Sequence, residues 1–150
     1  MTVKYTNERI GFSVEIPDGW RVASEDEASV LFKEEGREFG PNVLVSADEI
    51  PEGLSLHEGG LTFFERQFEE QFPDADFGNE QRIEIDGREA IAFNVGYAYD
   101  TDDGQVPVVK MAVFVRDGTR LFSVVGTSSP AEFEEKYPTF QGFALTLRPL

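Results

Sequence analysis

The sequence predicts an α+β fold: an antiparallel β-sheet meander with flanking helices. Three observations lead to this expectation. Apolar and polar residues alternate over several short segments, which is typical of half-buried strands. Asp-Gly pairs separate the segments of the second half, and this pair between alternating runs is a strong hairpin signal. One aromatic stripe at helical spacing marks a helix near the middle of the chain.

The first third of the chain predicts three short strands. Residues 12–16 alternate apolar and polar side chains and end at the turn residues 17–19, Pro-Asp-Gly. Trp20 follows this turn and is expected to anchor the core. Two further strands are expected at residues 29–33 and 42–47.

The clearest helix follows these strands. Ser55 can cap it, with Glu58 three residues later as the partner in a capping box. Its apolar positions form one continuous stripe: Leu61, Phe64, Phe68 and Phe72. Gly59 and Gly60 weaken the first turn, which favours a start near Leu61, and Pro73 ends the helix.

The remaining chain predicts a meander and a closing helical region. Four consecutive antiparallel strands are expected: residues 82–85, 89–99, 106–116 and 120–127. Ser129 and Pro130 then open a short helix with Phe133 and Tyr137 facing inward. A last apolar segment, residues 140–147, is expected to be helical as well.

Length and composition indicate one domain spanning residues 1–150. A chain of 150 residues with 40% hydrophobic residues, including 14 Phe, can form one ordinary core. The chain contains no cysteine, which excludes disulfides, thiolate zinc sites and cysteine nucleophiles.

The charge is strongly negative: 13 basic residues against 29 acidic ones give a net charge of −16. Such a field repels nucleic-acid phosphates and anionic lipids, so neither is expected as a partner. No apolar run approaches the roughly 20 residues that cross a bilayer, so membrane insertion is not expected. Only four basic residues are lysines. This composition leaves two interpretations open, a high-salt habitat or an ordinary acidic protein kept soluble by its charge.

The first residues of the given sequence bear on the cellular location of the protein. They contain no apolar export segment and no lipobox cysteine, so a cytoplasmic location is expected. An envelope-associated location is expected instead if a leader was removed.

The strand expected at residues 89–99 has two different faces. Large side chains point one way and are expected to be core: Ile91, Phe93, Val95, Tyr97 and Tyr99. Small residues on the other face form a shallow apolar trough, extended if Ala112 and Ser123 share that face. The candidate partner-binding residues are Ala90, Ala92, Gly96, Ala98 and Ala112. The alternative is that a terminal helix of the chain covers the trough.

Two acidic clusters have the density of carboxylates found in calcium-binding loops, but not the ligand spacing of such loops. Asp100, Asp102 and Asp103 lack the spacing and the distal glutamate of an EF-hand. Asp74, Asp76 and Glu80 form a second, equally loose match. Solvated loops are the alternative for both clusters.

No catalytic residue and no cofactor are predicted. His57 is the only histidine, and Ser55 lies too close in sequence to suggest a triad. The nucleophile elbow, zinc-protease, Walker A and dinucleotide-binding motifs do not occur in the sequence.

The order of these elements resembles PsbP-like domains along essentially the whole chain. Residues 11–20, Gly-Phe-Ser-Val-Glu-Ile-Pro-Asp-Gly-Trp, are similar to the N-terminal signature of that family. Residues 85–90, Ile-Asp-Gly-Arg-Glu-Ala, and residues 130–133, Pro-Ala-Glu-Phe, are similar to its meander and its late helix. The resemblance implies an antiparallel sheet between helices, a PsbP-like α/β/α sandwich. It extends to the bacterial DUF1795 group and to envelope proteins such as DcrB and LpqN.

Relatives of this kind bind proteins, so the resemblance implies a non-catalytic protein-binding or accessory module with an unidentified protein partner. Three alternatives remain open beside it. A DUF1795-type chaperone would hold a hydrophobic helix of its partner in the small-residue trough. A calcium-binding protein or metal-dependent hydrolase would use the acidic loops. An exposed sheet edge or trough could also serve a homodimer.

Overall fold

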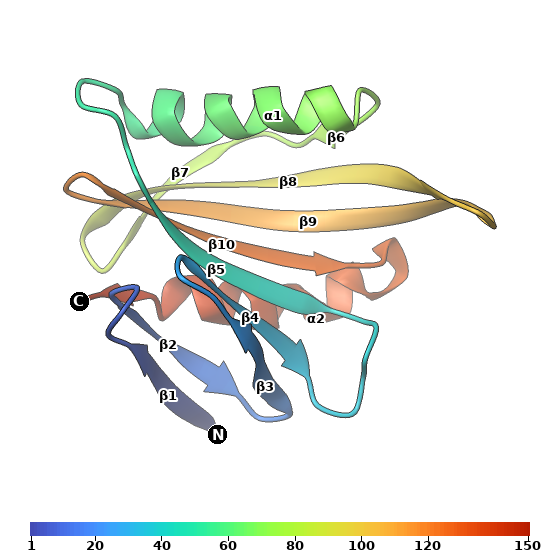
Figure 1. The fold of residues 1–150 in the computed structure, drawn as a ribbon, viewed down its shortest axis with the longest axis horizontal. Coiled ribbons are helices and arrows are strands. Elements are labelled where there is room, and N and C mark those ends of the chain that lie inside the picture. The colour runs from blue at the N-terminus through green and yellow to red at the C-terminus, as the bar shows by residue number, and fades with distance from the viewer.

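The computed structural model describes residues 1–150 and contains two antiparallel sheets and two helices (Figure 1). The small sheet has the order β1–β2–β11, and the large sheet has the order β3–β4–β5–β10–β9–β8–β6, with β7 also paired to β8. The strands of the small sheet are β1 (Thr2–Asn7), β2 (Phe12–Pro17) and β11 (Arg148–Pro149). Those of the large sheet are β3 (Trp20–Glu25), β4 (Ser29–Glu34), β5 (Asn42–Glu49), β6 (Asp76–Phe77), β7 (Gln81–Ile85), β8 (Arg88–Thr101), β9 (Gly104–Asp117) and β10 (Arg120–Ser128).

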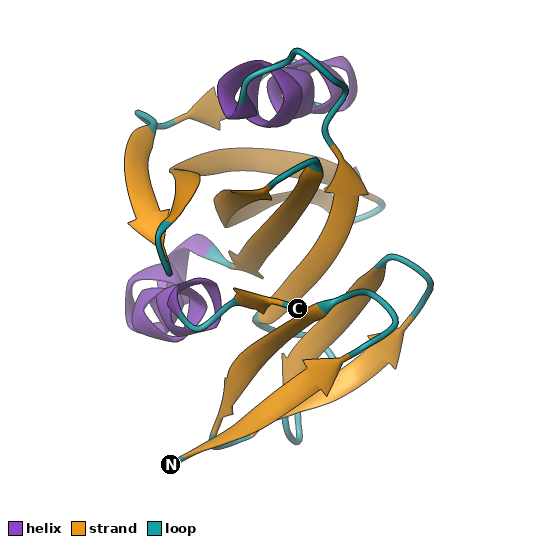
Figure 2. Ribbon diagram, turned by 90° about the vertical axis from the view of Figure 1, so that its left-hand side faces the viewer, coloured by secondary structure: helices purple, strands orange, loops and turns teal.

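The helices lie on opposite faces of the large sheet (Figure 2). Helix α1 (Phe63–Gln71), which continues a π-helical segment η1 (His57–Thr62), packs on one face. Helix α2 (Pro130–Leu145) and the small sheet pack on the other. The predicted α+β fold with an antiparallel sheet is confirmed. Neither helix combines the length with the apolar composition that crossing a bilayer requires.

The meander formed by β7, β8, β9 and β10 is confirmed, and Asp-Gly turns connect these strands. Each turn places residues in the left-handed backbone region, where glycine carries no Cβ penalty. At the β7–β8 turn both residues are left-handed, with φ of 53° at Asp86 and 75° at Gly87. This is the backbone of a type I′ hairpin, whose twist matches that of the flanking strands.

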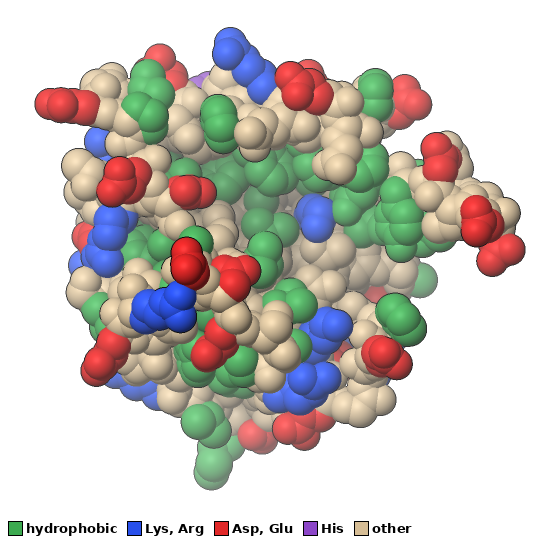
Figure 3. Space-filling view, viewed as in Figure 1, with side chains coloured by type: hydrophobic (Ala, Val, Ile, Leu, Met, Phe, Trp, Pro, Cys, Tyr) green, Lys and Arg blue, Asp and Glu red, His purple; other side chains and the backbone are tan.

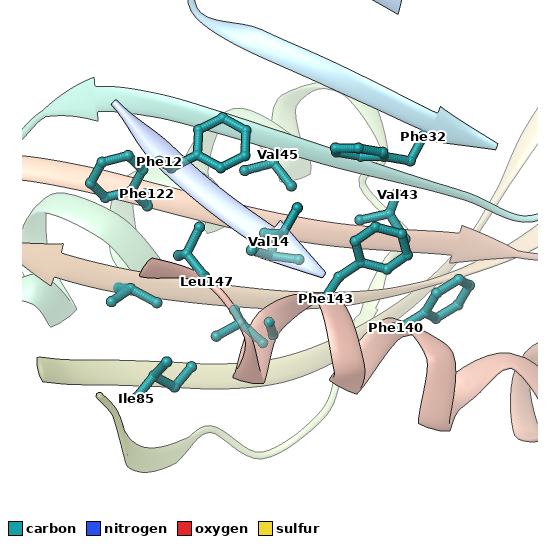
Figure 4. Packing of buried hydrophobic residues seen from close by; sticks show 14 of the residues in the cluster. Phe12, Val14, Phe32, Val43, Val45, Ile85, Phe122, Phe140, Phe143 and Leu147 are labelled. Atoms are coloured by element: carbon teal, nitrogen blue, oxygen red, sulfur yellow. The ribbon is translucent and has the colours of Figure 1, made fainter. Parts of the chain in front are cut away.

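The larger of two hydrophobic clusters lies between the large sheet, α2 and the small sheet (Figure 4). Phe143 of α2 is fully buried and packs against Phe32, with ring centroids 5.1 Å apart. Its ring also meets Trp20 edge-on at 5.5 Å, so Trp20 is the core anchor that the sequence predicts. The apolar alternation of β2 supplies Phe12 and Val14 to this cluster.

The smaller cluster fixes α1 on the opposite face. Every stripe residue predicted from the sequence faces the sheet: Leu61, Phe64, Phe68 and Phe72. Phe68 lies at the centre, with ring centroids 4.8 Å from Tyr97 and 5.3 Å from Phe64. The first of these pairs is edge-to-face and the second is stacked, and aromatic pairs of both kinds add to the free energy gained by burying the rings.

Several predicted boundaries are wrong. The helical run begins at His57 rather than near Leu61, because the first turn is π-helical. Ser55 and Glu58 form the expected capping box, with the Glu58 amide donating to Ser55 Oγ at 3.1 Å. Helix α2 runs unbroken through Pro138 instead of ending before residue 140. Strands β1, β3, β6 and β11 are not predicted by the sequence patterns.

Asp117, at the β9–β10 turn, predicts a dependence of stability on pH. Hydrogen bonds from Arg88 and then Arg120 hold the pKa of the Asp117 carboxyl below its ordinary value of 3.8. The folded pKa therefore lies below the unfolded one. The resulting stabilisation is complete above the unfolded pKa and is lost as pH falls through the folded pKa.

Asp117→Asn should therefore flatten the acid limb of the stability curve. Urea unfolding at about pH 6 and about pH 3 should show that the free energy of unfolding falls less with acidification for the variant than for the wild type. Asp103→Asn, at an exposed hairpin tip, is the control. Equal acid sensitivity in the wild type and in Asp117→Asn would contradict the assignment.

Candidate functional site

The small-residue trough predicted on β8 is only partly formed. Ala90 is fully buried in the larger cluster, and Ala92 is half-buried against the same cluster. Helix α2 thus covers this half of the trough, as the alternative of a covering terminal helix expects, and leaves no room there for a partner helix. Gly96 and Ala98 are half-buried, and a Cβ atom built on Gly96 would meet nothing within 4 Å. The trough is open only at this end.

The expectation that Ala112 extends the trough is wrong. The register pairs Ala112 with Phe93, so its side chain points to the face of the sheet that carries α1. Ser123 pairs with Phe114 and lies on that face as well. Tyr99 was expected in the core but is 42% exposed, because the β8–β9 hairpin extends past the end of α1 (Figure 1).

The acidic candidates do not come together. Asp100, Asp102 and Asp103 are all exposed at the β8–β9 hairpin, and Asp100 accepts a hydrogen bond from the Gln105 side chain at 3.2 Å. Glu80 lies 3.2 Å from the His57 ring rather than beside Asp74 or Asp76. No group of three or more His, Asp or Glu side chains has the geometry to hold a metal ion.

A second surface lies beside α1, on strands that the helix covers only in part. The α1 cluster spans β8 and β9 and includes Leu121 and Val125 of β10, while no helix covers the same face of β3, β4 and β5. We call this surface the open face. Because facing residues of adjacent strands point to the same side, the register arranges it in rows across the strands.

Three rows make up the open face. The apolar row is formed by Leu31, Leu44 and Val125 and continues beneath α1 into Ala112 and Phe93. The hydroxyl row is formed by Ser29, Ser46 and Ser123. The basic row is formed by Arg21, Lys33, Asn42, Thr127 and Lys110.

The apolar row is exposed in the middle of the sheet. Leu44 lies on the central strand β5 and is 37% exposed, while its neighbours Leu31 and Val125 are half-buried. On the other side of β5, Val43 and Val45 are fully buried. Along these strands the sheet is therefore buried on one face and only partly covered on the other.

Lys110 is a half-buried cation of the basic row. Its ammonium donates to Thr127 Oγ1 at 2.9 Å and lies 5.8 Å from the centre of the Tyr97 ring. No carboxylate lies within 4 Å of it. Burial without a counter-charge lowers the pKa of Lys110 and raises that of Tyr97.

The other two cations of the row also lack acidic partners. Lys33 reaches only the Glu38 carbonyl oxygen, at 3.4 Å, and Arg21 is exposed. Basic residues near α2 are different, because Arg37 binds both carboxylate oxygens of Glu132, at 2.7 and 3.1 Å. This pairing lowers the pKa of Glu132.

A hollow of about 480 Å³ adjoins the basic row, and its border includes Lys33, Asn42, Thr127, Tyr97 and Tyr99. Glu38 and Glu132 also border it, with Glu132 paired to Arg37. Figure 3 shows this side of the molecule hollowed below α1, with apolar side chains at the bottom and a basic one among them. Sequence reasoning missed this surface. Its residues come from five separate strands, β3, β4, β5, β10 and β9, and only the pairing register brings them into rows.

The architecture is a PsbP-like fold, the class that the sequence resembles. No family model matches the chain, and no curated protein does. Among solved structures, cyanobacterial PsbP from Synechocystis sp. PCC 6803 is similar, with a TM-score of 0.67, 16% identity, and coverage of 99% of this chain and 92% of that one. A variant of the protein Mog1 gives a TM-score of 0.69, 11% identity, and coverage of 99% and 96%.

LpqN, a Mycobacterium tuberculosis protein described as involved in cell envelope biogenesis, is similar as well. Its TM-score is 0.61 at 11% identity, with coverage of 98% of this chain and 89% of that one. At identities this low, the similarity shows a shared fold and does not transfer a partner or a site.

Proposed function

We propose that this protein is a non-catalytic binding or accessory module that docks a partner protein on its open face. The observation that carries the proposal is the partly exposed apolar row of Leu31, Leu44 and Val125, on strands whose opposite face is buried. Exposed apolar surface bordered by polar residues is typical of protein interaction sites. Similar folds in PsbP, Mog1 and LpqN support an accessory role.

The chemistry of the open face supports binding over catalysis. Catalysis by acyl transfer needs a hydroxyl beside a base that can take its proton. Ser46 Oγ and Ser123 Oγ are paired with each other, 2.6 Å apart. Ser29 Oγ donates to the Asp26 carboxylate at 3.0 Å, and hydrogen bonds from the Ala28 amide and from Ser29 hold the Asp26 pKa below its ordinary value, so this carboxylate is a weak base. His57 lies on the helical segment η1, where its ring contacts Glu80 and Thr62.

Leu44→Gln tests the position of the site. Burying one leucine side chain against a partner is worth about 1.5–3 kcal/mol, so the loss of this contact should weaken binding about tenfold or more. The glutamine keeps the charge unchanged and replaces a side chain that is already 37% exposed, so folding should be preserved. The measurement is affinity capture from the native extract, quantified by mass spectrometry.

Val3→Gln, on β1 of the small sheet, is the matched control because Val3 is 64% exposed. A specific partner should be retained by the wild type and by Val3→Gln, and lost by Leu44→Gln. If Leu44→Gln retains it fully, the protein is a binding module that uses another face.

A further inference from the structure

We propose that the open face binds an acidic amphipathic segment of a partner protein, whose carboxylates pair with Lys33 and Lys110 of the basic row. This inference rests on the proposed binding function and names the chemistry of the partner. It follows from three features of the surface: the uncompensated basic row, the desolvated position of Lys110, and the apolar row beside it.

The first feature is the distribution of charge. Acidic residues outnumber basic ones 29 to 13 in this chain, so each cation has many carboxylates available to it. Yet Arg21, Lys33 and Lys110 lie on one row of one face, without a carboxylate within 4 Å of any of them. Four other cations also lack a carboxylate within 4 Å, but they lie on four separate elements: Lys4, Arg66, Arg82 and Arg116. The row gathers three such cations into a local positive strip, which favours an anionic group there.

The second feature is the state of Lys110. The half-buried ammonium of Lys110 has lost part of its hydration. Within the protein it contacts one hydroxyl, that of Thr127, and one aromatic ring, that of Tyr97. Three donors are available on an ammonium, so two remain for other acceptors. A partner carboxylate would supply a charge-assisted hydrogen bond, which is about twice as strong as a neutral one.

The third feature defines the shape of the occupant. The apolar row lies two residues along the strands from the basic row, a separation of about 7 Å. Lys33 and Lys110 are three strands apart along their row, or about 14 Å. The matching surface is a segment with an apolar stripe flanked by acidic residues, long enough to reach across four strands.

The experiment places a photo-crosslinking amino acid at Leu44 in the native organism and sequences the adducts by mass spectrometry. The segments joined to Leu44 should be rich in apolar residues and carry net negative charge. Lys33→Glu should then reduce the adduct yield at least tenfold. Lys110→Met removes the second charge with a side chain that suits a half-buried site, and should reduce the yield as well.

Lys4→Glu is the matched control, because it makes the same change in net charge on exposed strand β1. It should leave the yield unchanged. The synthetic peptide of the recovered segment should then bind the wild-type protein, measured by fluorescence anisotropy, and bind Lys33→Glu at least tenfold more weakly.

Three results would overturn the proposal: basic or uncharged segments at Leu44, a yield as sensitive to Lys4→Glu as to Lys33→Glu, or adducts from the chain's own acidic β8–β9 hairpin. The last result would identify a second copy as the occupant. A crosslinker at Gly96 separates this proposal from the proposed function. Specific adducts at Gly96 and none at Leu44 would support a binding module but contradict the open face as its binding site.

Discussion

Phe143→Ala is expected to lower the free energy of unfolding by about 3–5 kcal/mol. Phe143 is fully buried and contacts Phe32 of β4 and Trp20 of β3, so its ring joins α2 to the edge of the large sheet. The loss combines the transfer free energy of the ring with the cavity it leaves. For a domain with about 5–15 kcal/mol of stability, this removes about a fifth or more.

Phe63→Ala is the matched control, because Phe63 is also helical but is 57% exposed. Its substitution should change the stability by less than about 0.5 kcal/mol. Urea unfolding followed by far-UV circular dichroism gives both values. Similar losses for the two variants would mean that α2 is not fixed to the sheet as described.

Gly126→Ala is expected to cost about 1–3 kcal/mol through overpacking. The ring of Phe140 lies directly on the backbone of β10 at this residue. A Cβ atom on Gly126 would lie 2.3 Å from Phe140 Cγ, with the neighbouring ring atoms at 2.6 and 2.7 Å. Phe140 is fully buried and cannot turn away without moving α2.

Gly96→Ala makes the same chemical change on the same sheet, where a Cβ atom meets nothing within 4 Å. It should be neutral or should stabilise the protein by up to about 1 kcal/mol, because glycine weakens a strand. A smaller side chain at Phe140 should reduce the cost of Gly126→Ala, which a double-mutant cycle measures. Additive losses in the cycle would exclude the contact between ring and backbone.

Most of the architecture could be predicted from local patterns. The meander follows from alternation and Asp-Gly turns, and the stripe Leu61–Phe72 correctly identifies the inner face of α1. The missed strands β1 and β3 have less regular patterns. Thr2–Asn7 is polar and mostly exposed, and β3 contains a register shift between Val22 and Ser24.

The site was less predictable, because it depends on which strands are neighbours. The alternation of β8 correctly separates Phe93 from Ala92. The alternation of β8 does not show whether Ala112 of β9 pairs with Phe93 or with a residue of the small-residue face. The sequence-based prediction assumed the small-residue face, whereas the register pairs Ala112 with Phe93. In the same way, Lys33 and Lys110 are 77 positions apart in sequence and share a row only because β5 and β10 lie between them.

The large sheet also divides the interior into two separate apolar compartments, with 19 buried residues on the α2 side and nine on the α1 side. The α1 compartment is held by a single helix with a π-helical first segment, so it has fewer contacts to lose on opening. Hydrogen exchange in α1 should then proceed by sub-global opening while α2 and the strands stay protected. A partner bound beside α1 would slow the hydrogen exchange of the α1 amides. The exchange rate of this helix would therefore measure how far the neighbouring open face is occupied.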